Sequence, residues 1–326
     1  MNLTNHRSTR DLLVLAGLAA ALLALPAVAS EFITSLALSC LMYAALASSW
    51  SLFCGATRYL SLATSAFFGI GAYVTALGLD ALPWPLLILA GAGAAALLAV
   101  LMGAAVLHLR GTYFAVLTFG MTELIRHAVT YGEKQVAGTV GRVLATVPEP
   151  GTVYLTVMLI AVAAVATAIG VRRSRFGLAL AGVGADEQRA QTLGVNTKLV
   201  KIAGFALTAA FAGAAGAAMA VRWTYIDPHT VFNPFIGFQT VLIALIGGAA
   251  TLWGPVIAAV VFSLLAETLR LQLPQLYMMV LGVLLILCVL YLPSGLASVR
   301  WAGVRATWSR VTHLLNVRPR GHGRSA

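Results

Sequence analysis

The chain has 326 residues, of which 60% are hydrophobic and only 10% are charged. A soluble domain carries about 25% charged residues, so this composition excludes a soluble enzyme or a large folded head and indicates an integral membrane protein. The net charge of +11 would suggest nucleic acid as the partner of a soluble protein. In a membrane protein it raises a different question, which side the basic residues occupy, and no nucleic acid is expected.

The first predicted element is an apolar segment at residues 12–29. It follows Arg7 and Arg10 and ends in small residues at 27–30, which is also the build of a secretory signal. Because further apolar segments follow at once, we interpret it as a retained first transmembrane helix. A short cytoplasmic N-terminus at residues 1–11 precedes it.

Further apolar segments bring the predicted number of crossings to ten, at about 20 residues per helix. They lie at residues 32–54, 59–79, 84–107, 111–130, 152–171, 202–221, 237–250, 252–270 and 275–292. Residues 12–298 are therefore expected to form an all-α, polytopic helical membrane domain, followed by a basic cytoplasmic tail at 299–326. The segment at 237–250 is too short for a full crossing, so a short, broken or re-entrant helix is expected there. A tilted pair of ordinary helices is the alternative.

The distribution of basic residues supports this topology. With ten crossings and a start inside the cell, the cytoplasmic segments hold sixteen basic residues and the outer segments hold three. Lys and Arg accumulate on the cytoplasmic side of membrane proteins. Both termini are therefore predicted to be cytoplasmic.

Small residues fill several of the predicted spans, as at 91–96 and 209–216. Faces of Gly and Ala let helices approach closely in lipid, where the hydrophobic effect adds little to helix association. This pattern indicates a tightly packed transport core. A general abundance of Ala and Gly in the genome explains it equally well.

Two of the spans carry polar side chains that a purely structural helix would not need. Residues 61–73 mix hydroxyl groups, aromatic rings and two glycines, although close packing explains them nearly as well. In the span at 111–130, Glu123 is an ionisable group in or near the bilayer, which suggests function, but Arg126 three residues later offers a purely structural ion pair. The candidate pathway residues are Ser61, Ser65, Tyr73, Tyr113, Thr118 and Glu123.

The largest predicted cytoplasmic loop covers residues 172–201. Its first basic residues, Arg172, Arg173 and Arg175, are expected among anionic headgroups, each stabilised by about 1 kcal/mol. Membrane lipid is therefore an expected partner.

A short helix is predicted further along the same loop. Asp186 and Glu187 suit its first turn, Ala190 and Leu193 are expected on one face, and Gly194 is expected to end it. A helix of about two turns is not stable alone. It must dock on the membrane surface or on a partner protein.

Five sequence blocks resemble the M-type permease subunit of ATP-binding-cassette importers for branched-chain amino acids. The blocks are SLATSAFFGIGAY at 61–73, RGTYFAVLT at 110–118, RSRFG at 173–177, DEQRAQTLG at 186–194 and GGAATLWGP at 247–255. The resemblance covers roughly residues 35–298. It implies a multi-pass permease in the bacterial inner membrane, together with ATP-binding subunits, a homologous second permease and a periplasmic or surface-tethered substrate-binding protein.

The resemblance also implies an ATPase-coupling helix, which enters a groove on the ATPase subunit. It would fall on residues 186–194, with Glu187, Ala190 and Gly194 at the matching positions, and Asp186 and Arg189 are the other candidate coupling residues. The chain departs from the family pattern at residues 178–184, which are apolar where basic residues are usual. Related permeases resemble carriers of urea or short amides, so that substrate class is an alternative.

The sequence offers little for other classes of protein. It has no GxxxxGK[ST] phosphate loop, so ATP is expected to be hydrolysed by another polypeptide, and its histidines and cysteines lack metal-ligand spacing. No catalytic residue, metal or cofactor is expected. The alternative from another class is an ion-coupled secondary transporter or channel, for which Glu123 and Glu267 are the candidate intramembrane carboxylates.

Overall fold

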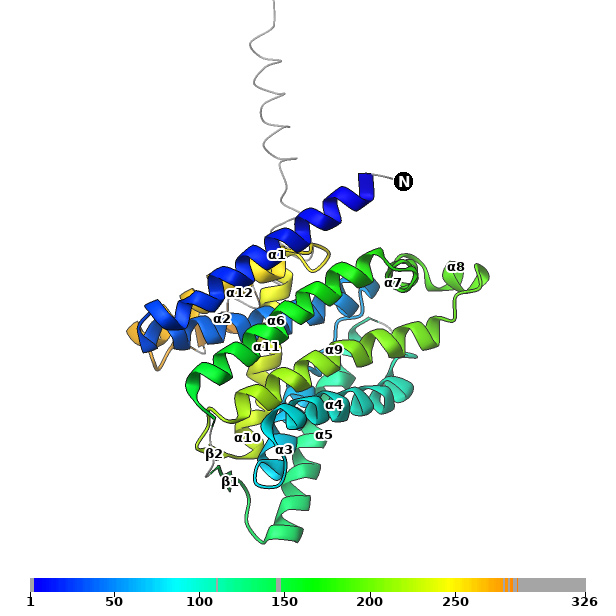
Figure 1. The fold of residues 1–326 in the computed structure, drawn as a ribbon. Helices are drawn as coiled ribbons and strands as arrows, with labels where there is room; N and C mark the ends of the chain where they lie inside the picture. The colour runs from blue at the N-terminus through cyan, green and yellow to red at the C-terminus, as the bar shows by residue number, and fades with distance from the viewer. Residues whose placement is uncertain are drawn as a thin grey trace, which may run out of the picture.

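The computed structural model describes residues 3–286, with the exception of residues 110, 145–147, 278, 281, 284 and 285. In this part of the chain the fold is a bundle of helices with one small two-stranded ribbon, so the predicted all-α class is confirmed (Figure 1). The predicted basic tail at 299–326 and most of the predicted last crossing lie outside the described residues.

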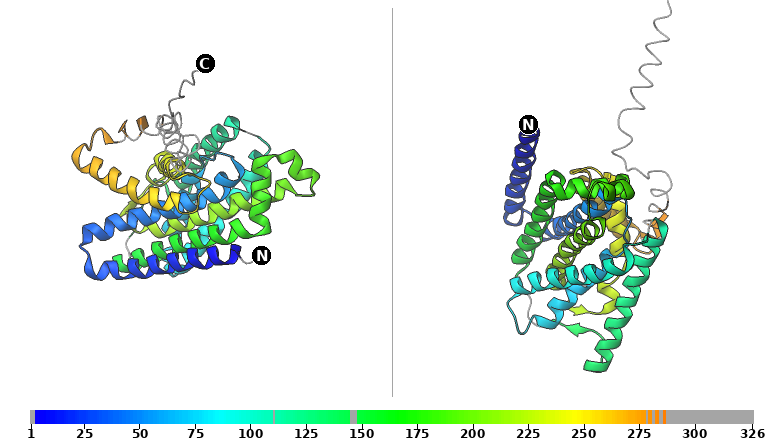
Figure 2. Two further views of the ribbon diagram at one scale, coloured as in Figure 1. Left: turned by 90° about the horizontal axis from the view of Figure 1, so that it is seen from above. Right: turned by 90° about the vertical axis from the view of Figure 1, so that its right-hand side faces the viewer.

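The elements follow one another with short connections. In chain order they are α1 (Leu3–Val28), α2 (Glu31–Trp50), the π-helix η1 (Ser51–Gly55), α3 (Thr64–Gly78), α4 (Trp84–Val106), α5 (Thr112–Ala137), β1 (Arg142–Val143), α6 (Pro150–Arg173), α7 (Arg175–Ala185), α8 (Glu187–Thr192), α9 (Thr197–Ala220), β2 (Tyr225–Ile226), α10 (Pro228–Val231), α11 (Pro234–Gly247) and α12 (Gly254–Gln272). Strands β1 and β2 pair in antiparallel fashion. Helix α1 packs along α6 on the outside of the bundle (Figure 2).

Six helical segments of the described chain are long and apolar enough to cross a membrane. They are Glu31–Gly55, Trp84–Val106, Pro150–Arg173, Thr197–Ala220, Pro228–Gly247 and Gly254–Gln272. Helix α3 is apolar but has only 15 residues, about 22 Å at 1.5 Å per residue. The multi-pass architecture is confirmed, whereas the count of ten crossings stays a prediction.

Helices α3, α4 and α9 meet through glycine. A Cβ atom added to Gly71 on α3 would lie 1.9 Å from the carbonyl oxygen of Gly213 on α9, and one added to Gly216 would lie 2.0 Å from the carbonyl oxygen of Phe68. No side chain fits at such distances. At these positions the small residues predicted to form a tight core are therefore required by the packing.

The short helix expected at 237–250 is present as α11, which has 14 residues. It ends at Gly247 and is capped by Gly248, whose φ of 85° favours glycine. Helix α12 begins at Gly254. A Cβ atom added to Gly247 would lie 2.3 Å from the carbonyl oxygen of Gly254, so the end of α11 and the start of α12 are in close contact. Half of the residues of α11 are buried in protein, which suits a helix shorter than the bilayer.

The guanidinium group of Arg172 binds the turn that joins α11 to α12. It donates to the backbone carbonyl oxygens of Ala250 and Thr251, at 2.8 and 2.7 Å. These carbonyl groups belong to the turn that follows α11, and a guanidinium group has several N–H donors with which to bind them together. Arg172 is nevertheless an exposed residue, so its location among lipid headgroups stays a prediction.

Candidate coupling hairpin and translocation pathway

Helices α7 and α8 join α6 to α9 and project from the end of the bundle (Figure 1). We call residues 174–196 the hairpin. Asp186 separates the two helices in an extended conformation, and its carboxylate accepts hydrogen bonds from the backbone N–H groups of Gln188 and Arg189, at 3.0 and 3.1 Å. Asp186 is therefore the N-cap of α8, which satisfies two of its free N–H groups.

Gly194 ends α8 as predicted. Its N–H donates to the carbonyl of Gln191 at 2.9 Å, and the N–H of Val195 donates to the carbonyl of Ala190 at 3.0 Å. With a φ of 84° at Gly194, this is the Schellman arrangement in which glycine avoids steric strain. A helix of only six residues is thus fixed by caps at both of its ends.

The faces of α8 differ in part from the prediction. Ala190 is 4% exposed and packs on the protein, whereas Leu193 is 84% exposed. The expectation that they share one face is wrong because Leu193 follows the last helical residue, where the C-terminal turn redirects the chain. The outward surface instead carries Leu193 and the side chain of Arg189, which is 85% exposed.

Glu187 points into the protein, where it meets Lys201 of α9 and Tyr59 of the connection before α3. We call Tyr59, Glu187 and Lys201 the Lys201 cluster. The Lys201 ammonium lies 2.7 Å from Glu187 Oε1 and donates to the carbonyl oxygen of Leu107, also at 2.7 Å. The Tyr59 hydroxyl donates to Glu187 Oε2 at 2.9 Å. The Lys201 and Glu187 side chains are only 6% and 10% exposed.

Tyr59 is the neutral member of the cluster. Burial raises the pKa of its phenol, and the hydrogen bond to Glu187 raises this pKa further, so the hydroxyl remains a donor at physiological pH. Its ring packs edge-on against Phe114 of α5, with 5.3 Å between ring centroids. Sequence reasoning missed Tyr59 and Lys201 as site residues. The signal for Lys201 is an ionisable residue within the first turns of an apolar helix, which needs a partner.

The structure brings together three of the candidate pathway residues at the start of α3. Thr118 Oγ1 on α5 accepts a hydrogen bond from the backbone N–H of Leu62 at 3.0 Å, and Ser61 and Ser65 lie one residue before and three residues after Leu62. All three hydroxyl side chains are buried. Ser65 Oγ is buried and has no hydrogen-bond partner among the described residues.

The remaining pathway candidates lie elsewhere. Tyr113 is 76% exposed on the outward face of α5. Glu123 pairs with Arg126, as the structural alternative predicted, and Arg126 Nη1 also lies 3.2 Å from His229 Nδ1. Tyr73 donates to Glu133 Oε2 at 3.0 Å, and the same oxygen accepts a hydrogen bond from the backbone N–H of Gly141, directly before β1, at 3.0 Å. The six candidates therefore do not form one continuous site.

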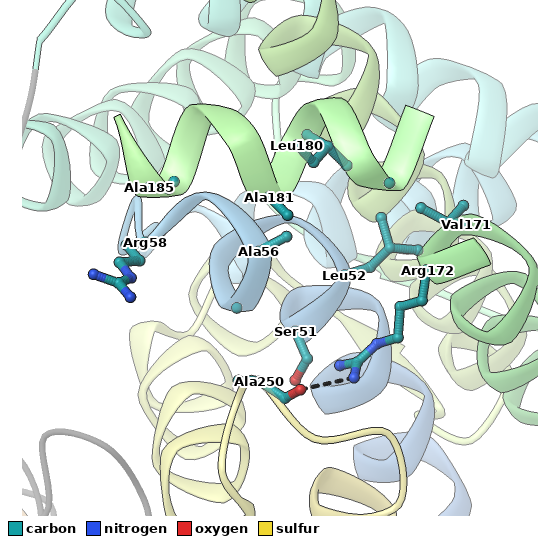
Figure 3. A pocket seen from close by; sticks show the side chains of 13 residues that line it. Ser51, Leu52, Ala56, Arg58, Val171, Arg172, Leu180, Ala181, Ala185 and Ala250 are labelled. Carbon is teal, nitrogen blue, oxygen red and sulfur yellow. Dashed lines mark hydrogen bonds between the residues drawn. The ribbon is translucent and has the colours of Figure 1, made fainter. Parts of the chain in front are cut away.

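A cavity of about 350 Å³ opens beside the hairpin (Figure 3). Helix α7 forms one wall through Leu180 and Ala181, and the end of α2 and η1 forms another through Ser51 and Ala56. Arg58 at its mouth has a φ of 61°, which is uncommon for a residue other than glycine.

Within the described chain, no group of three or more His, Cys, Asp or Glu side chains is placed to hold a metal ion.

These features define a polytopic helical membrane protein with a structured hairpin between two long apolar helices. Residues 32–289 match the family described as the permease component of branched-chain amino acid transport systems. The chain belongs to this family, so the predicted family and function are confirmed. It is the permease component of such an importer in the inner membrane, and ATP is hydrolysed by separate subunits.

Two curated relatives are similar to the chain over most of its length. Both are described as the high-affinity branched-chain amino acid transport system permease protein LivM. The protein of Escherichia coli K12 is 26% identical, over 89% of this chain and 75% of the relative. The protein of Salmonella typhimurium LT2 is 27% identical, over 74% of this chain and 64% of the relative. No solved structure matches the chain.

Proposed function

We propose that the chain forms one half of a transmembrane pathway for branched-chain amino acids and that an ATPase subunit drives it by docking on the hairpin. The observation that carries this proposal is the shape of α8. It is a helix of six residues, capped at both ends and anchored inward by Ala190 and Glu187. The outward side chains of Arg189 and Leu193 are exposed and could bind a partner protein.

The outward surface of α8 suits a groove on another protein. Leu193 offers an exposed apolar anchor, and Arg189 beside it forms an exposed ion pair with Asp186 at 3.1 Å. Protein interfaces combine a buried apolar anchor with a polar rim, and arginine is enriched among the residues that dominate their binding energy. Of the residues predicted for coupling, Arg189 would therefore touch the ATPase subunit directly. Asp186, Ala190 and Gly194 would shape the helix.

The outward face of α5 is the proposed contact with a homologous second permease. It exposes Tyr113, Leu124 and Tyr131 along the helix, and the partly exposed ion pair of Glu123 and Arg126 lies beside them. An ionisable pair within a span is costly in lipid and usually faces protein or water. A second permease covering this face would place the pathway between the subunits.

The amino acid would pass the cluster of hydroxyl groups at the start of α3. A zwitterion that leaves water needs hydrogen-bond partners, because an unpaired polar group in an apolar passage costs several kcal/mol. Ser65 and Thr118 would supply weak contacts of this kind, and Ser61 would supply another. Specificity would then rest chiefly with the separate substrate-binding protein.

The proposed orientation places the hairpin and both termini in the cytoplasm. Arg173 at the end of α6 forms a salt bridge with Asp11 of α1 at 3.2 Å. The start of α1 therefore lies at the same end of the bundle as the hairpin. The loop at residues 172–201, which contains the hairpin, holds six basic residues against Asp186 and Glu187, and this excess supports a cytoplasmic location for that end.

Arg189→Glu in the importer reconstituted with its ATPase subunits tests the docking. We expect ATP-driven leucine uptake to fall at least ~10-fold, equivalent to about 1.4 kcal/mol, because the charge reversal lies at the contact. Lys134→Glu is the matched control, since Lys134 is exposed near the opposite end of the bundle. Equal uptake in both variants would refute docking on α8. Labelled urea and a short amide, assayed beside leucine, test the alternative substrates.

A further inference from the structure

The Lys201 cluster joins four parts of the chain that are far apart in sequence. Glu187 is the first residue of α8, Lys201 lies near the start of α9, and Tyr59 lies in the connection between η1 and α3. The carbonyl group of Leu107 adds the end of α4. The hairpin is therefore bound at its base to several membrane helices through one buried ion pair.

Each donor and acceptor of the cluster has a partner on another element. Lys201 donates to Leu107 at 2.7 Å and to the Tyr59 hydroxyl at 3.4 Å, and its third contact is Glu187 at 2.7 Å. An ammonium group has three N–H donors, and a buried charge is tolerated only when it is paired and hydrogen-bonded. Since Tyr59 engages the second carboxylate oxygen, Glu187 cannot shift without changing contacts on both of its neighbours.

The Tyr59 connection leads directly to the pathway candidates. Two residues after Tyr59, the backbone carbonyl of Ser61 accepts a hydrogen bond from the Trp50 indole at 2.9 Å, and the next N–H, that of Leu62, donates to Thr118. Tyr59 itself packs on Phe114, one turn before Thr118 on α5. These contacts form a continuous route from Glu187 to the start of α3 and to α5.

From this geometry we infer that Tyr59, Glu187 and Lys201 are positioning residues that transmit movement of α8 to the pathway at the start of α3. This inference rests on the proposed docking of an ATPase subunit at α8. The cluster does not touch the transported amino acid. Its role is to keep the hairpin and the α3 connection moving together.

Tyr59→Phe is the decisive variant because it removes one hydroxyl and leaves the Lys201–Glu187 pair intact. In the reconstituted importer we expect the number of leucine molecules taken up per ATP hydrolysed to fall at least ~5-fold, the low end of coupling between two sites. Glu187→Gln should lower the same ratio. The double variant should show no further loss, because both changes break one link.

Tyr154→Phe is the matched control. Tyr154 is also buried and also loses a single hydrogen bond, from its hydroxyl to the carbonyl of Leu22 at 3.0 Å. A purely structural role for Tyr59 would lower the thermal stability of both variants and leave both transport ratios at the wild-type value. That result would overturn the inference.

The proposed function and this inference fail in different ways. Wild-type protein that shows no ATP-driven leucine uptake, or an Arg189→Glu variant that transports normally, would contradict the proposed function. If Arg189→Glu blocks uptake but Tyr59→Phe and Glu187→Gln both keep the wild-type ratio, docking on α8 stands and transmission through the Lys201 cluster is refuted.

Discussion

Replacing Gly71 by alanine should destabilise the protein severely. The added Cβ atom would lie 1.9 Å from the carbonyl oxygen of Gly213, whereas ordinary van der Waals contact begins at 3.4 Å. Helices α3 and α9 would therefore have to separate by about 1.5 Å, because backbone cannot rotate away as a side chain can. Overpacking of a core costs about 1–3 kcal/mol and occasionally more. We expect the upper end of that range.

Gly93→Ala is the control for this prediction. Gly93 also lies within a helix, α4, but a Cβ atom added there meets nothing within 4 Å. Alanine is favoured over glycine in a helix interior by about 1 kcal/mol in peptides, so this variant should be neutral or slightly stabilised. Thermal unfolding of the two variants in the same detergent or lipid nanodisc measures the difference. Equal midpoints would refute the view that glycine is required where α3 meets α9.

Two further predictions concern the pathway and the topology. Ser65→Ala should lower the maximal rate of leucine uptake without changing the half-saturating concentration. Ser48→Ala removes another buried hydroxyl with no partner in the described chain, and this control should leave uptake unchanged. A large rise in the half-saturating concentration for Ser65→Ala would instead indicate a specific binding site. In intact cells, the variant Thr139→Cys should react with an impermeant thiol reagent and the variant Leu193→Cys should not. Labelling of Leu193→Cys from outside would reverse the proposed orientation.

The local features of the hairpin could be predicted from sequence because they depend on neighbouring residues. Asp186 caps α8 through N–H groups two and three residues away, and Gly194 closes it through carbonyls of its last turn. The short α11 was also predictable, since it ends at a pair of glycines where the apolar run stops. Each of these interactions spans only a few residues, so the sequence pattern contains all of its partners.

The direction of Glu187 could not be predicted in the same way. Its partner Tyr59 lies 128 residues away along the chain, and the pairing exists only because α9 and the α3 connection meet in the folded protein. Arg172 is a similar case, since its acceptors are carbonyl groups about 78 residues further on. The sequence pattern marked Lys201 only as one of the basic residues of a cytoplasmic loop. Packing instead buries its charge against Glu187.

The energetics of the Lys201–Glu187 pair favour a role in orientation over one in stability. Removing one partner of a buried pair costs about 3–5 kcal/mol, yet replacing both by apolar side chains of similar volume is often neutral. The pair therefore adds little net stability that leucine or methionine could not supply. Apolar side chains do not form directional contacts. The ammonium of Lys201 and the two oxygens of Glu187, in contrast, bind separate partners at defined distances. A helix of six residues whose outward face must meet another protein needs its rotation fixed, and its first residue is held in this way.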